Sequence, residues 1–188
     1  FLAIPTEKDG VPWDGALRNV MENLVSIPTS REEPVLVIVE STLTPGMSED
    51  VIIPIAEESD LELGEDLLFG VAPRRDWFIS PDKNLRSLPR VFGGTDQYTT
   101  DLMEQVLGVV CQNLVPAPDH EHAELVKSVE NAYRHVGITL ANQLSRAYPN
   151  TDMREVLRLV GTKWNIPTYH PSVGTGGYCI PLASQYVM

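Results

Sequence analysis

Three polar residues recur at helical spacing and could serve one reaction site. Lys127, Asn131 and Arg134 follow one another at steps of four and three residues, which would place their side chains on one face of a helix. An ammonium, an amide and a guanidinium together can donate hydrogen bonds to an anionic substrate or to a developing oxyanion. A solvent-exposed helix face could carry the same residues, so this row is a candidate and not yet a site.

A cysteine inside a glycine-rich loop is the second candidate. The loop reads Gly174-Thr-Gly-Gly-Tyr-Cys179-Ile-Pro181. Its glycines allow the backbone to approach a ligand closely and to present N–H groups to an anion. Cys179 could then act as a nucleophile, with Lys127 as the cation that activates it. The alternative is an ordinary turn around an inert, buried cysteine.

The other reactive side chains give weaker signals. Cys111 ends an apolar helical segment, so we expect it in the core. His120 and His122 match no metal-ligand spacing, so we expect both at the surface and no metal site. His170 comes shortly before the glycine-rich loop, where it could line a site or simply face solvent.

The composition is that of a soluble globular protein and disfavours several functional classes. Of the 188 residues, 43% are hydrophobic and 21% are charged, and the net charge is −12. Nucleic-acid binding is disfavoured because phosphate contacts require clustered lysine and arginine. No apolar run approaches the roughly 20 residues of a membrane span. The two cysteines form no CxxC pair, which fits a reducing cytoplasm.

One long helix is expected to organise the chain, from about residue 121 to residue 147. Helix-forming residues fill this stretch, Asp119 can cap its start, and Pro149 follows its end. Apolar residues recur along it with nearly helical period, which predicts one buried stripe. The stripe consists of Ala123, Val126, Val129, Tyr133, Val136, Leu140 and Leu144.

Strands alternate with helices before the long helix, which predicts an α/β fold with a mostly parallel sheet. The expected strands are residues 1–4, 35–39, 67–71, 90–92 (ended by Gly93-Gly94) and 113–116, with a loop at 8–12. The expected helices are 14–27, 48–58, 99–111 and 152–160, with an irregular tail from Thr162. Ligands of such sheets bind beyond the carboxyl ends of the strands. Those ends carry Pro5-Thr6, Ser41-Thr42 and Ala72-Pro73, and no GxGxxG turn is present.

Five ordered motifs give the chain a resemblance to a known family. They are AIPT from Ala3, ESTLTPG from Glu40, PRVFGG from Pro89, AELVKSVENAYRHVGITLANQL from Ala123 and HPSVGTGGYCIP from His170. The chain resembles the nucleotide-sugar dehydrogenases, the UDP-glucose and UDP-N-acetylhexosamine 6-dehydrogenase family. The resemblance implies the rear part of a Rossmann-like NAD-binding domain at residues 1–118. It implies a central helical region for dimerisation and substrate binding at 119–188. The opening βαβ unit and a last domain would be absent, so we expect the chain alone to be inactive.

The resemblance also implies a reaction. Enzymes of this family oxidise the C6 alcohol of a sugar nucleotide twice, with two NAD⁺, to give a uronic acid for polysaccharide biosynthesis. Cys179 would form a thiohemiacetal and then a thioester, Lys127 would stabilise the oxyanion, and Asn131 would help to hold it or a water. Glu130 to Arg134 together with GGYCIP looks more like the N-acetylhexosamine branch, of mannosamine or galactosamine type, than the UDP-glucose branch.

Further positions take their expected roles from the same resemblance. Pro5, Thr6, Ser41 and Thr42 would border the NAD. The long helix would form a homodimer interface. The UDP-sugar would be bound by Arg134, Tyr169, His170, Gly176 and Gly177.

Two positions depart from the family pattern. The family usually has an aspartate four residues after the cysteine, where this chain has Ala183, and a glutamate where it has Arg74. Without these carboxylates, the base that would activate water for thioester hydrolysis is unassigned. A non-catalytic scaffold that binds sugar nucleotides or dimerises is therefore a second hypothesis. Another NAD-dependent enzyme of the 6-phosphogluconate-dehydrogenase-like superfamily is a third.

Overall fold

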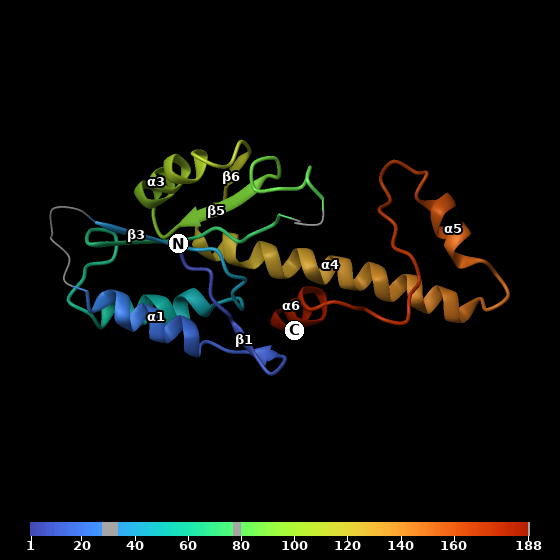
Figure 1. The fold of residues 1–188 in the computed structure, drawn as a ribbon, viewed down its shortest axis with the longest axis horizontal. Coiled ribbons are helices and arrows are strands. Elements are labelled where there is room, and N and C mark those ends of the chain that lie inside the picture. The colour runs from blue at the N-terminus through green and yellow to red at the C-terminus, as the bar shows by residue number, and fades with distance from the viewer. Residues whose placement is uncertain (28–33, 77–79, 188) are drawn as a thin grey trace. The chain divides into compact units, whose positions relative to one another are not determined.

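The computed structural model describes residues 1–27, 34–76 and 80–187 (Figure 1). The chain forms two compact units, Phe1–Ser128 and Val129–Met188. The boundary falls inside the long helix α4, His120–Ala147, so this one helix supplies residues to both units. Within the parts of the chain that the structure describes, no helix is both long and apolar enough to cross a membrane.

The first unit is built on a four-stranded sheet in the order β3-β4-β5-β6. Its strands are β3 (Val35–Val39), β4 (Leu67–Val71), β5 (Arg90–Gly94) and β6 (Leu114–Pro116). The β3–β4 and β5–β6 pairs are parallel, whereas β4 and β5 are antiparallel. The predicted α/β class with a mostly parallel sheet is therefore confirmed.

Two strand predictions were wrong in detail. The expected strand at residues 1–4 is reduced to one parallel bridge between Leu2 and Val39. The glycine pair does not end β5, because Gly93 and Gly94 pair with Val71 and Gly70 of β4. These glycines allow a close approach and do not mark a turn: a Cβ on Gly93 would collide with the Asp119 carbonyl.

Helices cover both faces of the sheet (Figure 1). Alternate residues of β3 point to opposite sides. Val37 and Val39 join a core cluster with Leu17 and Met21 of α1 (Gly15–Val25), and Ile38 joins another with Met103 of α3 (Gln97–Gly108). These six side chains are at most 2% exposed, so the sheet is a central layer between helices.

Three local elements differ from their predictions. The helix expected at 48–58 is a π-helical turn, η1 (Ser48–Ile52), followed by α2 (Ile53–Glu57). Pro54 supplies a reason, since it has no N–H for a regular helical bond. The loop expected at 8–12 is a small hairpin of β1 (Glu7–Lys8) and β2 (Val11–Pro12). Asp14 precedes α1, but its carboxylate pairs with Arg18 at 2.9 Å and does not cap the helix.

The start of α4 is capped as predicted. The Asp119 carboxylate accepts a hydrogen bond from the His122 backbone N–H at 2.8 Å. This bond holds the pKa of Asp119 below its usual value. The carboxylate therefore satisfies one of the free N–H groups of the first helical turn.

Replacing Asp119 by alanine should destabilise the chain by about 1 kcal/mol, the usual cost of losing a cap. Because the folded pKa is depressed, the carboxylate contributes stability above its unfolded pKa and loses it as pH falls through the folded value. Urea unfolding at pH 7 measures the effect. Asp119→Asn keeps an acceptor and is the control, so equal losses for both variants would contradict the capping role.

The predicted buried stripe of α4 was wrong over its middle. Tyr133, Val136 and Leu140 are 78%, 69% and 57% exposed. The buried side of the helix includes small or polar residues: Ala123, Glu124, Ser128, Asn131 and Ala141. The apolar residues do recur at helical spacing, but in the single chain the middle of this stripe is exposed to solvent.

The second unit packs two shorter helices and a long connection with the end of α4. α5 spans Met153–Val160 and begins at Asp152, whose side chain accepts bonds from two backbone N–H groups. Ala141, Met153 and Leu157 form the buried cluster, with Tyr169 packed against it. Gly137 is required there, since a Cβ would overlap the Tyr169 ring.

The tail was predicted to be irregular, and this was wrong for its last part. Residues Cys179–Tyr186 form α6. Pro181 lies in the first helical turn, where a missing N–H costs nothing. The sequence pattern Gly-Gly-Tyr-Cys-Ile-Pro therefore marks a helix start and not a continuing loop.

Candidate active site

Hydroxyl groups tie the segment after the Leu2 bridge to the loop that follows β3. Thr6 Oγ1 donates to the Thr42 carbonyl at 2.6 Å. Ser41 Oγ accepts from the Ile4 N–H at 2.8 Å and donates to the Ile4 carbonyl at 2.7 Å. The structure thus brings Thr6, Ser41 and Thr42 together at the carboxyl end of β3, with the exposed Pro5 beside Thr6. This edge of an α/β sheet is where dinucleotides bind.

These residues fit one side of a dinucleotide site. The hydroxyls of Thr6 and Ser41 are occupied in holding the two loops, so contact with NAD would fall to the backbone and to the Pro5 ring. The chain has no glycine-rich turn of the GxGxxG type for a pyrophosphate. The four predicted residues can therefore shape a rim for the cofactor but cannot hold the whole of it.

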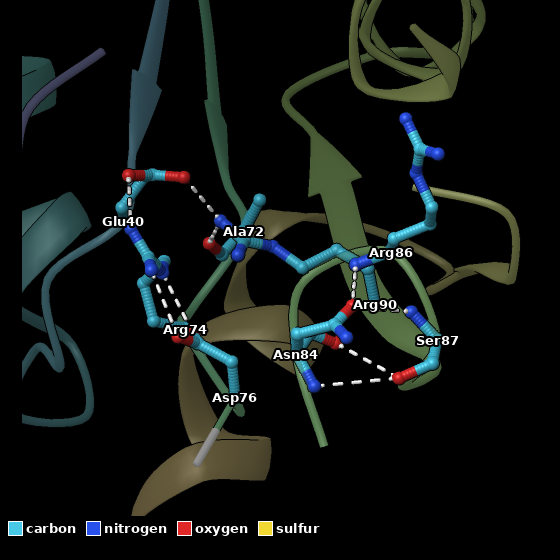
Figure 2. Close-up of polar contacts among 8 residues, drawn as sticks. All are labelled: Glu40, Ala72, Arg74, Asp76, Asn84, Arg86, Ser87 and Arg90. Atoms are coloured by element: carbon cyan, nitrogen blue, oxygen red, sulfur yellow. Dashed lines mark hydrogen bonds and ion pairs between the residues drawn. The ribbon is translucent and has the colours of Figure 1, made fainter. Parts of the chain in front are cut away.

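A charge network lies next to this edge (Figure 2). Arg90, only 2% exposed, contacts Glu40 Oε1 at 2.6 Å and donates to the Ala72 carbonyl at 2.5 Å through the same Nη2. Arg74 makes a bidentate pair with Asp76 at 2.7 and 2.8 Å. Its Nη1 is 3.8 Å from Glu40 Oε2, so Glu40 lies between the two guanidinium groups.

The network removes Asp76 as a candidate base. The hydrogen bond from Arg74 lowers the pKa of Asp76, and the same bond raises the pKa of Arg74. A carboxylate with a depressed pKa that is held by two N–H donors is a poor proton acceptor. Arg74, which stands where the resemblance expects a glutamate, is thus a fixed cation, and Asp76 does not replace that glutamate.

Glu124 is a buried acid that the sequence patterns did not single out. Its carboxylate accepts from the Met47 N–H at 3.1 Å, from the Ser48 N–H at 3.2 Å and from the Ser48 hydroxyl. Glu124 is 2% exposed, and its carboxylate lies against the first residues of η1, where backbone N–H groups need acceptors. Burial raises the pKa of Glu124 against the opposing effect of these bonds. The sequence held one signal for this burial: Glu124 is next to the apolar Ala123, and the small Ser128 follows one helical turn later.

Replacing Glu124 by glutamine should change how stability depends on pH. A raised folded pKa means that the glutamate contributes stability below its unfolded pKa and loses it as pH rises through the folded value. Glutamine does not titrate, and its NH₂ group would face a backbone donor, which costs about 1–3 kcal/mol. Urea unfolding from pH 4.5 to 8 should show the variant's deficit shrinking as pH rises. A deficit that widens with pH would contradict the raised pKa.

One histidine prediction was wrong and one was right. His120 is 7% exposed. Its Nε2 lies 2.9 Å from Glu49 Oε1, and its ring stands edge-on to Phe69 at 5.6 Å. The first residue of α4 packs back against the sheet and is therefore buried. His122 is at the surface, as predicted, and its ring contacts Asp119 at 2.7 Å.

The predicted catalytic residues occupy different environments. Asn131 is 3% exposed, Lys127 is half-buried and has a partner, and Arg134 is exposed. Only part of the predicted polar row therefore faces solvent. Cys179 is exposed as the first residue of α6, whereas Cys111 is buried in the first unit, as predicted. Cys179 is therefore not the buried cysteine of the alternative interpretation.

The predicted sugar-binding residues are not alike either. His170, Gly176 and Gly177 are exposed, and Gly177 has a φ of +85°, which favours glycine. Tyr169 instead packs its ring on Gly137. His135, which the sequence patterns did not single out, contacts Ser184 of α6 at 2.7 Å. The only signal for it was its position four residues after Asn131.

An apolar groove of about 710 Å³ lies between α4 and α5 within the second unit. The exposed stripe residues Tyr133, Val136 and Leu140 line it on the α4 side, and Val156 and Val160 line it on the α5 side. Almost all of the lining is carbon. Such a surface on one chain is typical of a protein interface.

Comparison with known proteins identifies the second part of the chain. Residues 121–188 match the central domain of the UDP-glucose/GDP-mannose dehydrogenase family. These residues belong to that family. The match contains Lys127, Asn131 and Cys179, so the three residues with candidate chemistry all lie within the matched stretch.

Individual relatives extend the similarity into the first unit. Protein CapL of Staphylococcus aureus is 31% identical over 160 residues, which cover 81% of this chain and 37% of that protein. The UDP-N-acetyl-D-glucosamine 6-dehydrogenase of Salmonella typhi is 31% identical over 159 residues, covering 81% and 36%. The structure of a UDP-D-ManNAc dehydrogenase from Pyrococcus horikoshii has a TM-score of 0.83 at 26% identity, covering 96% of this chain and 43% of that one. The chain thus spans just over a third of the length of these curated relatives.

Proposed function

We propose that the chain carries the reaction centre of an NAD-dependent nucleotide-sugar 6-dehydrogenase. The substrate would be a UDP-N-acetylhexosamine, and its C6 alcohol would become a uronic acid for polysaccharide biosynthesis in the cytoplasm. The single observation behind the proposal is the exposed Cys179 at the head of α6, inside the family's central domain. In this proposal residues 1–118 are part of the NAD-binding domain and residues 119–188 are the central region.

NAD⁺ would accept the hydride in each of the two oxidation steps. Cys179 supplies the covalent chemistry: its sulfur adds to the C6 aldehyde, and the carbonyl oxygen takes a proton to give a thiohemiacetal. Loss of hydride and of the hydroxyl proton leaves a thioester. Water then adds to that carbonyl, the C–S bond breaks, and the acid leaves as the thiol is regenerated.

Lys127 and Asn131 would stabilise the oxygen that becomes negative in these additions. They are four residues apart in the continuous helix α4, so both lie on one face. Asn131 is 3% exposed, and a donor held in a water-poor setting stabilises an oxyanion more than one in water does. Arg134, His170, Gly176 and Gly177 would bind the UDP-sugar, and Tyr169 would support that region through its packing on Gly137.

The names of the relatives support an N-acetylated sugar. The Salmonella protein is a UDP-N-acetyl-D-glucosamine 6-dehydrogenase, and the Pyrococcus structure is a UDP-D-ManNAc dehydrogenase. A mannosamine or galactosamine configuration remains our proposal, with the gluco isomer and UDP-glucose as the alternatives. The ENxxR sequence from Glu130 to Arg134 is the feature of this chain that favours the N-acetyl branch.

The decisive test measures NADH formation by the source polypeptide, which is the polypeptide in which the source organism expresses these 188 residues. UDP-N-acetylmannosamine, its galacto and gluco isomers and UDP-glucose form the panel. Two NADH per sugar support the proposal and identify the substrate. One NADH with sugar trapped on Cys179 shows that hydrolysis stalls. We expect no turnover from the 188 residues alone.

A scaffold without catalysis is the second candidate. It is favoured by Ala183, which is 3% exposed and offers no carboxylate, and by Arg74, which is fixed in a charge network. This candidate predicts that UDP-sugars bind but that no NADH forms with any of them. A thioester or thiohemiacetal on Cys179, detected by intact mass, would exclude it.

We also propose a homodimer through α4. The exposed stripe and the apolar groove together leave Tyr133, Val136 and Leu140 uncovered in the single chain. A second copy would bury these side chains at about 25 cal/mol per Å² of apolar surface. The symmetry of such a contact would place the same stripe on both partners.

Replacing Leu140 by glutamate should weaken this dimer, because an unpaired charge would have to be buried in an apolar interface. The dissociation constant should rise at least about tenfold, which corresponds to 1.4 kcal/mol. Sedimentation equilibrium measures it. Gln143→Glu, on an exposed position of the same helix, is the matched control. A dimer that is equally weakened by both variants would argue against the stripe.

A further inference from the structure

The helix that begins with Cys179 contacts α4 through a partly buried hydrogen bond. His135 Nδ1 lies 2.7 Å from Ser184 Oγ, and Ser184 Oγ lies 2.6 Å from the Ile180 carbonyl. Both bonds lie within the second unit. Ser184 is 5% exposed and belongs to the buried face of α6 together with Ala183 and Tyr186. The pair therefore joins α4 to the packed side of α6.

The protons of this pair can be assigned from its chemistry. A hydroxyl has one proton, and the Ile180 carbonyl can only accept, so Ser184 donates to Ile180. Ser184 Oγ must then accept from His135, which requires a proton on Nδ1. Both the neutral Nδ1–H tautomer and the charged ring can donate this bond, so the contact holds in either form.

The position of His135 relates the pair to the proposed reaction. His135 follows Asn131 by four residues and Lys127 by eight in the same helix. The three side chains therefore lie along one side of α4. Ser184 follows Cys179 by five residues in α6. The bond thus connects the helix of the proposed oxyanion donors to the helix of the proposed nucleophile.

We propose that His135 is a positioning residue: by donating Nδ1–H to Ser184 it fixes α6 on α4 and so fixes the surroundings of the Cys179 thiol. The catalytic consequence rests on the proposed function, whereas the contact and its effect on the thiol do not. Neither His135 nor Ser184 needs to touch the substrate. Catalytic sites require their reacting groups to be held to within a fraction of an ångström by such supporting contacts.

The first experiment uses the 188-residue chain. Hydrogen exchange of the amides in α6 and the rate of Cys179 alkylation by iodoacetamide, read by peptide mapping, are compared with wild type. His135→Leu should speed exchange about three- to tenfold, the worth of one hydrogen bond, and should change the alkylation rate at least threefold. Ser184→Ala should do the same, and the double variant should be no worse than either, because both remove one interaction.

Two variants test the chemistry of the contact. His135→Asn keeps an N–H donor at the same number of bonds from the backbone and should restore both rates. His122→Leu, an exposed histidine of the same helix, is the matched control and should alter neither. Unchanged exchange and alkylation in His135→Leu would overturn the proposal, and so would failure of asparagine to restore them.

The second experiment uses the source polypeptide with its UDP-sugar. His135→Leu should lower kcat about tenfold with little change in the KM for the sugar, and asparagine should restore kcat. An unchanged kcat in an active enzyme would overturn the positioning role. If the wild type forms no NADH, the proposed function fails, and the exchange and alkylation rates still decide this proposal by themselves.

Discussion

Replacement of Cys179 by serine is expected to lower NADH formation from a UDP-sugar by at least about 10³-fold in the source polypeptide. A serine hydroxyl is a much weaker nucleophile than a thiolate, and the ester that it would form offers no good leaving group. The KM for the sugar should change little, because the thiol is proposed to act on the aldehyde and not in binding. Steady-state rates at saturating NAD⁺ measure the effect.

Cys111→Ser provides the matched control for this result. Cys111 is the other free thiol of the described chain and is 6% exposed in the first unit. Its replacement should cost about 1 kcal/mol of stability, as typical core changes do, and leave turnover intact. A Cys179→Ser enzyme that forms NADH at the wild-type rate would refute the covalent mechanism.

The second large effect is expected on stability. Arg90→Met should lower the free energy of unfolding by about 3 kcal/mol, the low end for breaking a buried ion pair. The substitution keeps most of the side-chain volume but leaves the Glu40 carboxylate facing the more distant Arg74, at 3.8 Å, and removes the Arg90 donor from the Ala72 carbonyl. Urea unfolding at pH 7 is the measurement.

Two further variants make this test specific. Adding Glu40→Gln to Arg90→Met should recover part of the loss, because the unpaired charge is then gone. Arg86→Met, four residues earlier and exposed, should fall within about 0.5 kcal/mol of wild type. In Figure 2 Arg86 points away from the network, which makes it a suitable control. Equal losses from Arg86 and Arg90 would show that the network does not stabilise the fold.

Patterns of apolar and helix-forming residues predicted the elements that have similar surroundings along their whole length. The apolar runs of β3 and β4 gave their residue ranges correctly, because strands buried on both faces need no alternation. The bounds of α4 were correct to one residue, since its cap and helix formers agree. Proline and glycine were misread as breaks at α6 and at the end of β5, because their effect depends on position in the helix and on the neighbouring strand.

The site was predictable only to the level of residue types. Helical spacing singled out Lys127 and Asn131, and the glycine-rich loop singled out Cys179. Neither pattern could show that Asn131 is buried while Arg134, three residues on, is exposed. Contacts between distant segments, such as Glu124 with Ser48 and His135 with Ser184, produce no periodic pattern in the sequence. His120 was placed at the surface for the same reason, since its burial depends on Phe69 of β4.

The carboxylate of Glu124 has a consequence for the order of events during synthesis. It caps η1 across 77 and 76 positions of sequence, through the N–H groups of Met47 and Ser48. At about 5–20 residues per second, a ribosome needs several seconds to add those residues. The Ser48 N–H therefore lacks its Glu124 acceptor until the first turns of α4 have left the ribosome. Completion of the first unit must wait for the helix that the second unit shares.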